Sequence, residues 1–111
     1  MDLQKQAEAD LLLKQGRREA ESGQLKEAAQ FYQQALAIYR EIGDRSEIAN
    51  SLNHLGFAYK SIGQYQQAIE YYQQELTLRR ELGDRRQEGY SLTNLGITYG
   101  SLGQYHKAIE P

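Results

Sequence analysis

The residue types that could catalyse a reaction or hold a metal ion are few in this sequence. It contains two histidines, His54 and His106, and no cysteine. A catalytic histidine needs a second acid or base within reach, and a zinc site needs several converging ligands. No second histidine, cysteine or paired carboxylate shares the helix side that carries His54. We therefore predict no catalytic residue, no metal site and no cofactor, and we expect that the protein is not an enzyme.

Amide and apolar side chains that lie off the apolar stripe suit contact with a ligand rather than catalysis. Asn50, Asn53 and Phe57 fall on one side of a predicted helix, about 100–200° from its apolar stripe. Asparagine both donates and accepts hydrogen bonds, as an extended peptide backbone requires. The candidate binding residues on this and the equivalent helix sides are Arg17, Asn50, Asn53, His54, Phe57, Tyr90, Thr93, Asn94 and Ile97.

These sides are equivalent because the sequence repeats itself. Residues 51–90 match the preceding 40 residues at 14 positions without a gap, and 12 of the 21 residues after Tyr90 match the start of the same unit. A fixed period of 20–50 residues is typical of a solenoid, in which each unit buries its apolar face against its neighbours. We divide the single domain 1–111 into repeats at about 3–43 and 44–83 and a truncated repeat at about 84–111.

Each repeat is predicted to contain two helices. Apolar residues recur at helical spacing, strand alternation is missing, and the only proline is Pro111. Short turns between long helices require antiparallel packing, so the fold class is all-α. The predicted helices are 3–22, 25–42, 45–62, 64–82 and 85–102, with a sixth that starts after Gly103 and is cut off at Pro111.

The links between helices carry recognisable stop and start signals. Gly23 and Gly43 follow helices as left-handed stops. Asp44 with Glu47 three residues later predicts a capping box, in which each side chain satisfies a backbone N–H. Asp84 repeats the pattern with Gln87. We interpret the two Gly-Asp-Arg triplets as turn chemistry, with a binding role as the alternative.

Leu52, Leu55-Gly56, Tyr59, Gly63, Tyr65, Ala68 and Tyr72 form a pattern that returns from Leu92 to Ala108. This pattern resembles the tetratricopeptide repeat (TPR), a helix-turn-helix unit. The 40-residue period is similar to the long-helix variant of Leu-Gly-Asn repeat proteins and kinesin light chains. The resemblance covers about residues 10–110 and implies a right-handed α-solenoid. Gly56 and Ala68 are small where the two helices would cross, and Tyr59 and Tyr72 fill the gap beside the crossing.

In TPR proteins the first helices of successive units line a concave groove, so the resemblance implies that the candidate residues face it. Two alternatives remain: Phe57 and Ile97 pack against the next helix, or Asn53 and Asn94 are ordinary solvated residues. Leu-Gly-Asn proteins often carry Asn after Leu-Gly, where this chain has Phe57 and Ile97, which implies a more apolar peptide. The basic clamp that some TPR domains use for a carboxylate is not intact, since Arg17 and Lys14 supply only its first row.

Composition narrows the partners further. A net charge of -2 gives no basic surface for nucleic acid. No apolar run approaches the roughly 20 residues of a membrane helix, and the N-terminus does not resemble a secretory signal. The absence of cysteine suits a reducing compartment, so we expect a cytoplasmic protein.

We therefore predict a scaffold that binds a protein or peptide in its concave groove. The alternative function is structural: the repeats stack on further repeats or on a second copy. The stripe Leu92, Leu95, Tyr99 and Leu102 has only Tyr105, Ala108 and Ile109 to cover it. We expect an uncovered apolar face there, and association through it, most simply as a homodimer.

Overall fold

The chain forms a stack of five helices. The computed structural model describes residues 2–109, and side chains within residues 2–106. The helices are α1 (Leu3–Glu21), α2 (Leu25–Ile42), α3 (Arg45–Ser61), α4 (Tyr65–Leu82) and α5 (Arg85–Ile109). The residues described contain no strand, and none of their helices is long and apolar enough to cross a membrane.

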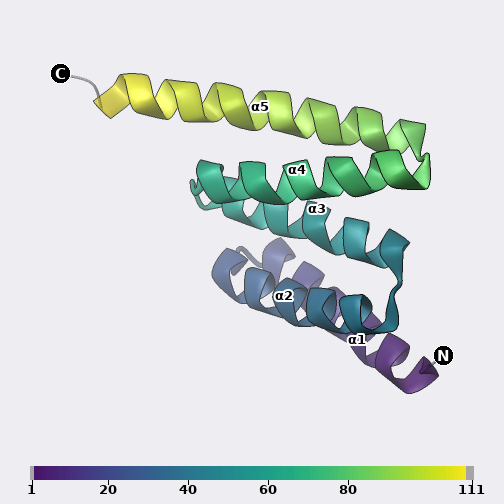
Figure 1. The fold of residues 1–111 in the computed structure, drawn as a ribbon. Helices are drawn as coiled ribbons and strands as arrows, with labels where there is room; N and C mark the ends of the chain where they lie inside the picture. The colour runs from purple at the N-terminus through teal and green to yellow at the C-terminus, as the bar shows by residue number, and fades with distance from the viewer. Residues whose placement is uncertain (1, 110–111) are drawn as a thin grey trace.

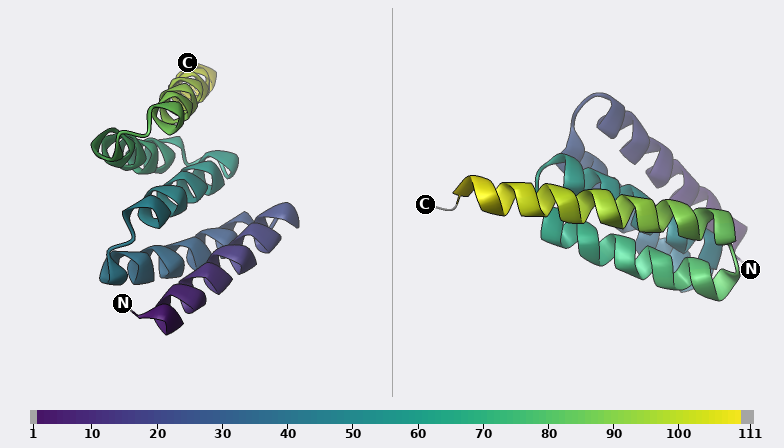
Figure 2. Two further views of the ribbon diagram at one scale, coloured as in Figure 1. Left: turned by 90° about the vertical axis from the view of Figure 1, so that its right-hand side faces the viewer. Right: turned by 90° about the horizontal axis from the view of Figure 1, so that it is seen from above.

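Successive helices run antiparallel and pack in chain order. The main contacts join α1 to α2, α2 to α3, α3 to α4 and α4 to α5. Figure 1 shows the stack from α1 to α5, and Figure 2 shows its zigzag from the side. The molecule is elongated, at 55 × 32 × 18 Å. This is the predicted all-α helical solenoid, with one helix pair per 40-residue period.

Glycine ends the first four helices as predicted. Gly43 and Gly83 are left-handed, with φ of 74° and 71°, and Gly23 and Gly63 in the shorter turns have φ of 82° and 83°. Few other residues adopt this conformation without strain. These four glycines therefore fix the positions of the turns between helices.

The predicted capping boxes form only in part. Asp44 accepts a hydrogen bond from the backbone N–H of Glu47 at 3.2 Å, and Asp84 accepts one from that of Gln87 at 3.3 Å. In the first box, the prediction that the Asp44 N–H donates to the Glu47 side chain is wrong. This N–H donates to the carbonyl of Tyr39 instead. The carboxylate of Glu47 is then free to accept a hydrogen bond from Asn50.

The predicted stop at Gly103 and the sixth helix are also wrong. Helix α5 continues through Gly103 to Ile109. At Gly23 and Gly63 the next helix packs back onto its predecessor, whereas no helix within residues 2–109 packs back after Gly103. A turn there would give up helical hydrogen bonds and bury no apolar surface in exchange. Ala108 and Ile109, predicted to begin the cover of α5, lie outside the described side chains.

The crossing of each helix pair is a glycine beneath a tyrosine ring. A Cβ atom on Gly16 would lie 2.5 Å from the ring of Tyr32, and one on Gly56 would lie 2.6 Å from the ring of Tyr72. Tyr32 and Tyr72 are 3% and 1% exposed. The predicted small residue at the crossing is therefore required by this contact.

Successive pairs are joined by tyrosine and glutamine. Gln33 of α2 donates to the hydroxyl of Tyr59 in α3 at 3.0 Å, and Gln73 donates to that of Tyr99 at the same distance one period later. The ring of Tyr59 also stacks on Tyr71, with centroids 5.5 Å apart. Gln33 and Gln73 are exposed, and each bridges two repeats.

Gly56→Leu tests the crossing. Because the new side chain must displace the buried Tyr72 ring, we expect a loss of about 1–3 kcal/mol in the free energy of unfolding. Gly96→Leu is the matched control, since a Cβ atom on Gly96 meets nothing within 4 Å. Thermal unfolding followed by circular dichroism should show a lower melting temperature for Gly56→Leu alone. Equal melting temperatures of the two variants would contradict this account.

Candidate functional site

One stripe of α3 is covered by neither α2 nor α4. Phe57 and Ser61 are exposed on it, and Asn50, Asn53 and His54 are partly buried along its edges. The residues on the opposite side, Leu52, Leu55 and Ala58 among them, are fully buried. The stripe is the predicted binding side, and its counterparts on α1 and α5 carry Arg17 and Tyr90, Thr93, Asn94 and Ile97.

Three apolar side chains on these stripes are exposed to solvent. Phe57 is 51% exposed, Tyr90 57% and Ile97 50%. Phe57 remains exposed although α5 lies next in the stack, so α5 does not bury it. Helices α3 and α5 thus present a discontinuous apolar surface.

An open hollow of about 630 Å³ lies between α1 and the start of α3. Its lining includes the cations Lys14 and Arg17 and the carboxylates of Asp10, Asp44 and Glu47. The carboxylates are held by hydrogen bonds within the protein: Asp10 by Tyr39, Asp44 by Gln6 and Glu47 by Asn50. Lys14 and Arg17 take part in none of the ion pairs within the described part of the chain. The hollow is therefore lined by charges of both signs, three carboxylates and two cations.

Asn50 and Asn53 are held by a buried ion pair on α4. Arg79 Nε lies 3.2 Å from a carboxylate oxygen of Glu75, and the two residues are 5% and 1% exposed. A guanidinium nitrogen of Arg79 donates to Asn50 Oδ1 at 2.8 Å, and Asn53 Nδ2 donates to Glu75 at 3.2 Å. The two asparagines thus supply polar partners that the buried charges need.

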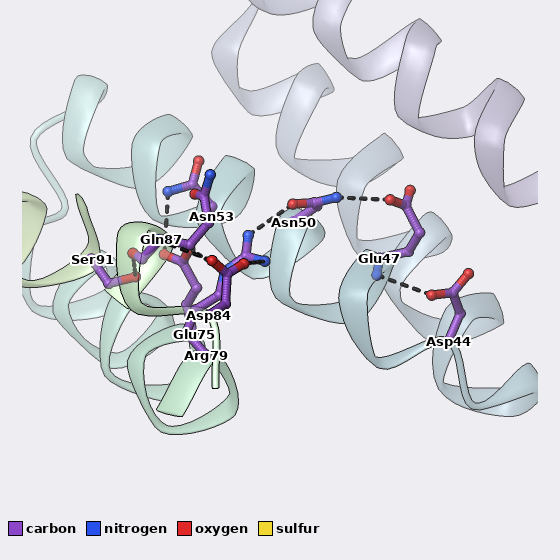
Figure 3. Close-up of polar contacts among 9 residues, drawn as sticks. All are labelled: Asp44, Glu47, Asn50, Asn53, Glu75, Arg79, Asp84, Gln87 and Ser91. Carbon is purple, nitrogen blue, oxygen red and sulfur yellow. Dashed lines mark hydrogen bonds and ion pairs between the residues drawn. The ribbon is translucent and has the colours of Figure 1, made fainter. Parts of the chain in front are cut away.

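The same cluster links three helices. Asn50 Nδ2 donates to Glu47 at 2.7 Å, and Arg79 also lies 3.5 Å from Asp84, which caps α5. Figure 3 shows this chain of contacts from Asp44 to Ser91. Both polar atoms of the Asn50 amide are engaged, whereas the oxygen of Asn53 points away from Glu75 (Figure 3). Of the two, Asn53 keeps an acceptor for a ligand.

The first repeat fills the equivalent positions differently. Ala35 and Tyr39 stand 40 residues before Glu75 and Arg79, and Asp10 stands before Asn50. The Tyr39 hydroxyl donates to Asp10, and both Ala35 and Tyr39 are fully buried. Burial, the bond to Asp10 and the nearby Glu47 carboxylate raise the pKa of Tyr39. The same two positions thus carry the Glu75–Arg79 ion pair in the second repeat, and Ala35 with the hydrogen-bond donor Tyr39 in the first.

His54 is part of an inter-repeat contact. Its ring stacks on Tyr32 of α2, with centroids 5.0 Å apart and an interplanar angle of 24°. Burial and then the nearby Arg17 cation lower the pKa of His54. His54 is therefore packed between repeats and only partly exposed.

On α5, the side-chain hydroxyls of threonines donate hydrogen bonds to backbone carbonyls of the same helix. Thr93 is exposed and its hydroxyl donates to the carbonyl of Gly89 at 3.0 Å, and Thr98 donates to the carbonyl of Asn94 at 2.7 Å. The Asn94 side chain is partly buried. No three His, Asp or Glu side chains in the described part of the chain come together as a metal site.

The comparisons with known proteins agree with this geometry. A tetratricopeptide repeat pattern matches residues 47–111, more than half of the chain, and a second one matches residues 16–42. The chain belongs to the tetratricopeptide repeat family. TPR units generally mediate protein–protein interactions. No curated protein matches the sequence.

Two solved structures share the TPR fold. The TPR domain of FLU from Arabidopsis superposes with a TM-score of 0.85 at 22% identity, over 94% of this chain and 87% of that one. BtubC (BKLC) from P. vanneervenii gives a TM-score of 0.81 at 22% identity, over 90% of this chain and 42% of that one. At this identity the likeness concerns the fold alone.

Sequence reasoning missed Glu75 and Arg79, whose ion pair holds Asn50 and Asn53. They stand at the positions of Ala35 and Tyr39, which are fully buried in the first repeat. Alignment of the two second helices would therefore have placed both charges in the interior. Their spacing of four residues marks them as a pair on one helix face.

Arg79→Met tests the ion pair. It leaves the buried Glu75 carboxylate without a cation, and we expect a loss of about 3–5 kcal/mol in the free energy of unfolding. The fourfold variant Asn50→Asp, Asn53→Leu, Glu75→Ala and Arg79→Tyr, which installs the first repeat's set, should regain most of it. Urea unfolding provides the comparison. If Arg79→Met were as stable as wild type, the ion pair with Glu75 would not contribute to stability.

The stacked His54 makes stability depend on pH. Because its folded pKa lies below the ordinary 6.5, the unfolded chain binds more protons as the pH falls through 6.5. Stability should therefore decrease as the pH is lowered through that value. His54→Gln should flatten the decrease in urea midpoints measured between about pH 7.5 and 5.5. An identical slope in the two proteins would show that His54 does not contribute.

Proposed function

We propose that the protein binds a segment of a partner protein in the groove lined by α1, α3 and α5. The single observation that carries this proposal is the exposure of Phe57, the only large apolar side chain of α3 that stays exposed between two packed neighbours. Aromatic side chains tend to dominate interface energies. An exposed one on the binding side of a TPR array is therefore a natural anchor.

The groove suits a ligand with apolar side chains and a polar end. Phe57, Tyr90 and Ile97 supply apolar contact along α3 and α5. At the α1 end, the open hollow brings Arg17 and Lys14 together with the carboxylates of Asp10, Asp44 and Glu47. An extended segment lying across the three helices would meet apolar surface first and then these charged side chains.

Polar side chains on the same surface would fix the ligand's backbone. The free oxygen of Asn53 can accept from a peptide N–H, and the exposed hydroxyl of Thr93 can accept as well. Asn94 and the edge of His54 are partly buried beside them. Asn50 has a different role: it orients Arg79 and so keeps this side of α3 rigid before a ligand arrives.

Phe57→Ala tests groove binding. Peptides selected from a displayed random library on the wild-type chain should lose affinity for Phe57→Ala by about tenfold or more, since truncated hot spots cost about 2 kcal/mol or more. Helical content by circular dichroism should not change.

Leu11→Ala is the matched control for this test. Leu11 is also exposed, at 57%, but it lies outside the predicted binding row of α1. Selected peptides should bind this variant as they bind wild type. Full binding to Phe57→Ala would place the ligand elsewhere and reject the groove.

A second candidate function is assembly. On α5, Leu92 is 47% exposed and Tyr99 50%. Such an uncovered apolar face favours contact with a further helix or with a second copy as a homodimer. Sedimentation at increasing concentration distinguishes the second copy from a monomer that receives a separate helix.

A further inference from the structure

The side-chain amide of Asn53 is held in one orientation by a buried carboxylate. Asn53 Nδ2 donates to Glu75 at 3.2 Å, and Glu75 is 1% exposed. Glu75 is paired with the guanidinium of Arg79, and an ionised carboxylate accepts hydrogen bonds but has none to donate. Turning the Asn53 oxygen toward Glu75 would therefore bring two acceptors together and break the bond. The oxygen points away from Glu75 instead (Figure 3).

The neighbouring amide of Asn50 has no atom left for a ligand. The guanidinium of Arg79 only donates, so it takes the Asn50 oxygen, at 2.8 Å. The Asn50 amino group donates to Glu47 at 2.7 Å. Of these two amides on α3, Asn53 is the one with a free atom, and that atom is an acceptor.

Position 93 on α5, which is 40 residues after Asn53, also presents an acceptor. The hydroxyl of Thr93 is exposed and donates its one hydrogen to the carbonyl of Gly89 at 3.0 Å, which leaves the oxygen lone pairs. Helices α3 and α5 run in the same direction (Figure 1), so the two positions lie in one row. The equivalent residue of α1 is Leu13, which forms no hydrogen bond. Each polar member of the row has thus spent its donor inside the protein.

Each acceptor lies one helical turn from an exposed apolar side chain. Phe57 follows Asn53 by four residues, and Ile97 follows Thr93 by four, a spacing that places both members of a pair on one helix face. A partner segment that packs on Phe57 and Ile97 therefore passes the two acceptors. Its backbone carries N–H donors and carbonyl acceptors, and only the N–H groups suit this row.

We propose that Glu75 is a positioning residue of the groove. By holding the Asn53 amino group it restricts position 53 to accepting a hydrogen bond, so that α3 selects a backbone N–H of the partner segment and disfavours an acceptor there. Glu75 acts only through Asn53, because it is itself buried. This inference rests on the proposed function and deepens it: it names the ligand group that Asn53 binds and the residue that fixes the choice.

The test uses peptides selected from a displayed random library on the wild-type chain. Each peptide bond in turn is replaced by an ester, which removes one N–H and puts an oxygen in its place. At one position the ester should weaken binding by about tenfold, since the Asn53 oxygen then loses its donor and faces a second acceptor. The same ester should cost little against Asn53→Ala, as a double-mutant cycle requires of two groups in contact.

Glu75→Gln separates positioning from mere stability. A glutamine amide both donates and accepts, so Asn53 can turn its amino group toward the ligand in this variant. The ratio of amide to ester affinity at the Asn53-coupled position should therefore fall from about tenfold to a few-fold. Glu70→Gln is the matched control, because it removes the same charge from an exposed position of α4 and should leave the ratio as in wild type.

Two further comparisons localise the effect. Phe57→Ala should weaken the amide and ester peptides alike and leave their ratio unchanged. The ester position that is coupled to Thr93, identified with Thr93→Val, is an internal reference. Glu75→Gln should leave the ratio at that position unchanged, because Thr93 is bonded to its own helix and not to Glu75.

Two results would overturn the inference and leave groove binding intact. One is a scan in which no ester penalty depends on Asn53, and the other is an equal ratio in Glu75→Gln and wild type. If Glu75→Gln loses helical content, the triple variant Asn50→Asp, Glu75→Ala and Arg79→Tyr takes its place, since it installs the first repeat's residues and should lower the ratio as well. Selected peptides that bind Phe57→Ala fully would instead reject the groove, and this inference with it.

Discussion

A tyrosine ring resting on a glycine sets the distance between the two helices of each pair. Tyr32 on Gly16 and Tyr72 on Gly56 leave no room for a Cβ atom, so each ring packs directly against the backbone of the partner helix. The aliphatic cluster of Leu36, Leu52 and Leu55 fills the space beside the first crossing, where α3 packs against α2. The stripe that remains uncovered on α3 is then determined.

Local signals made most of the fold predictable. Gly43 and Gly83 adopt left-handed angles that the sequence could anticipate from glycine alone, and Asp44 and Asp84 cap the helices that follow. Gly103 misled the prediction because a helix stop also needs a partner to pack against. Gly103 has the same residue type and register as Gly63, yet its helix continues. Tertiary packing, which local sequence does not encode, decides between the two outcomes.

The exposed side of α3 was predictable from helix geometry, and the contacts of its polar residues were not. Phe57 and Ile97 are exposed, as expected from their positions away from the apolar stripes of their helices. The engagement of Asn50 and Asn53 depends on Glu75 and Arg79, which lie 22 to 29 residues away in the sequence. Only the alignment of repeats connects them, since Ala35 and Tyr39 mark the same positions as interior. The pairing of His54 with Tyr32 is equally non-local, because it joins two different repeats.

The polar residues also solve a problem that the glycine and tyrosine contact creates. Since the same crossing recurs in each repeat, the glycine and tyrosine contact alone does not distinguish α1 from α3 as a surface for α4; the short turn between α3 and α4 does, and the polar residues add to it. Docking on α1 would place Glu75 and Arg79 against Leu13 and Asp10, leaving Glu75 beside an apolar side chain with no donor. On α3, Asn53 donates to Glu75 and Asn50 accepts from Arg79. The apolar contacts therefore suit either surface, and the buried polar set is matched only between α3 and α4.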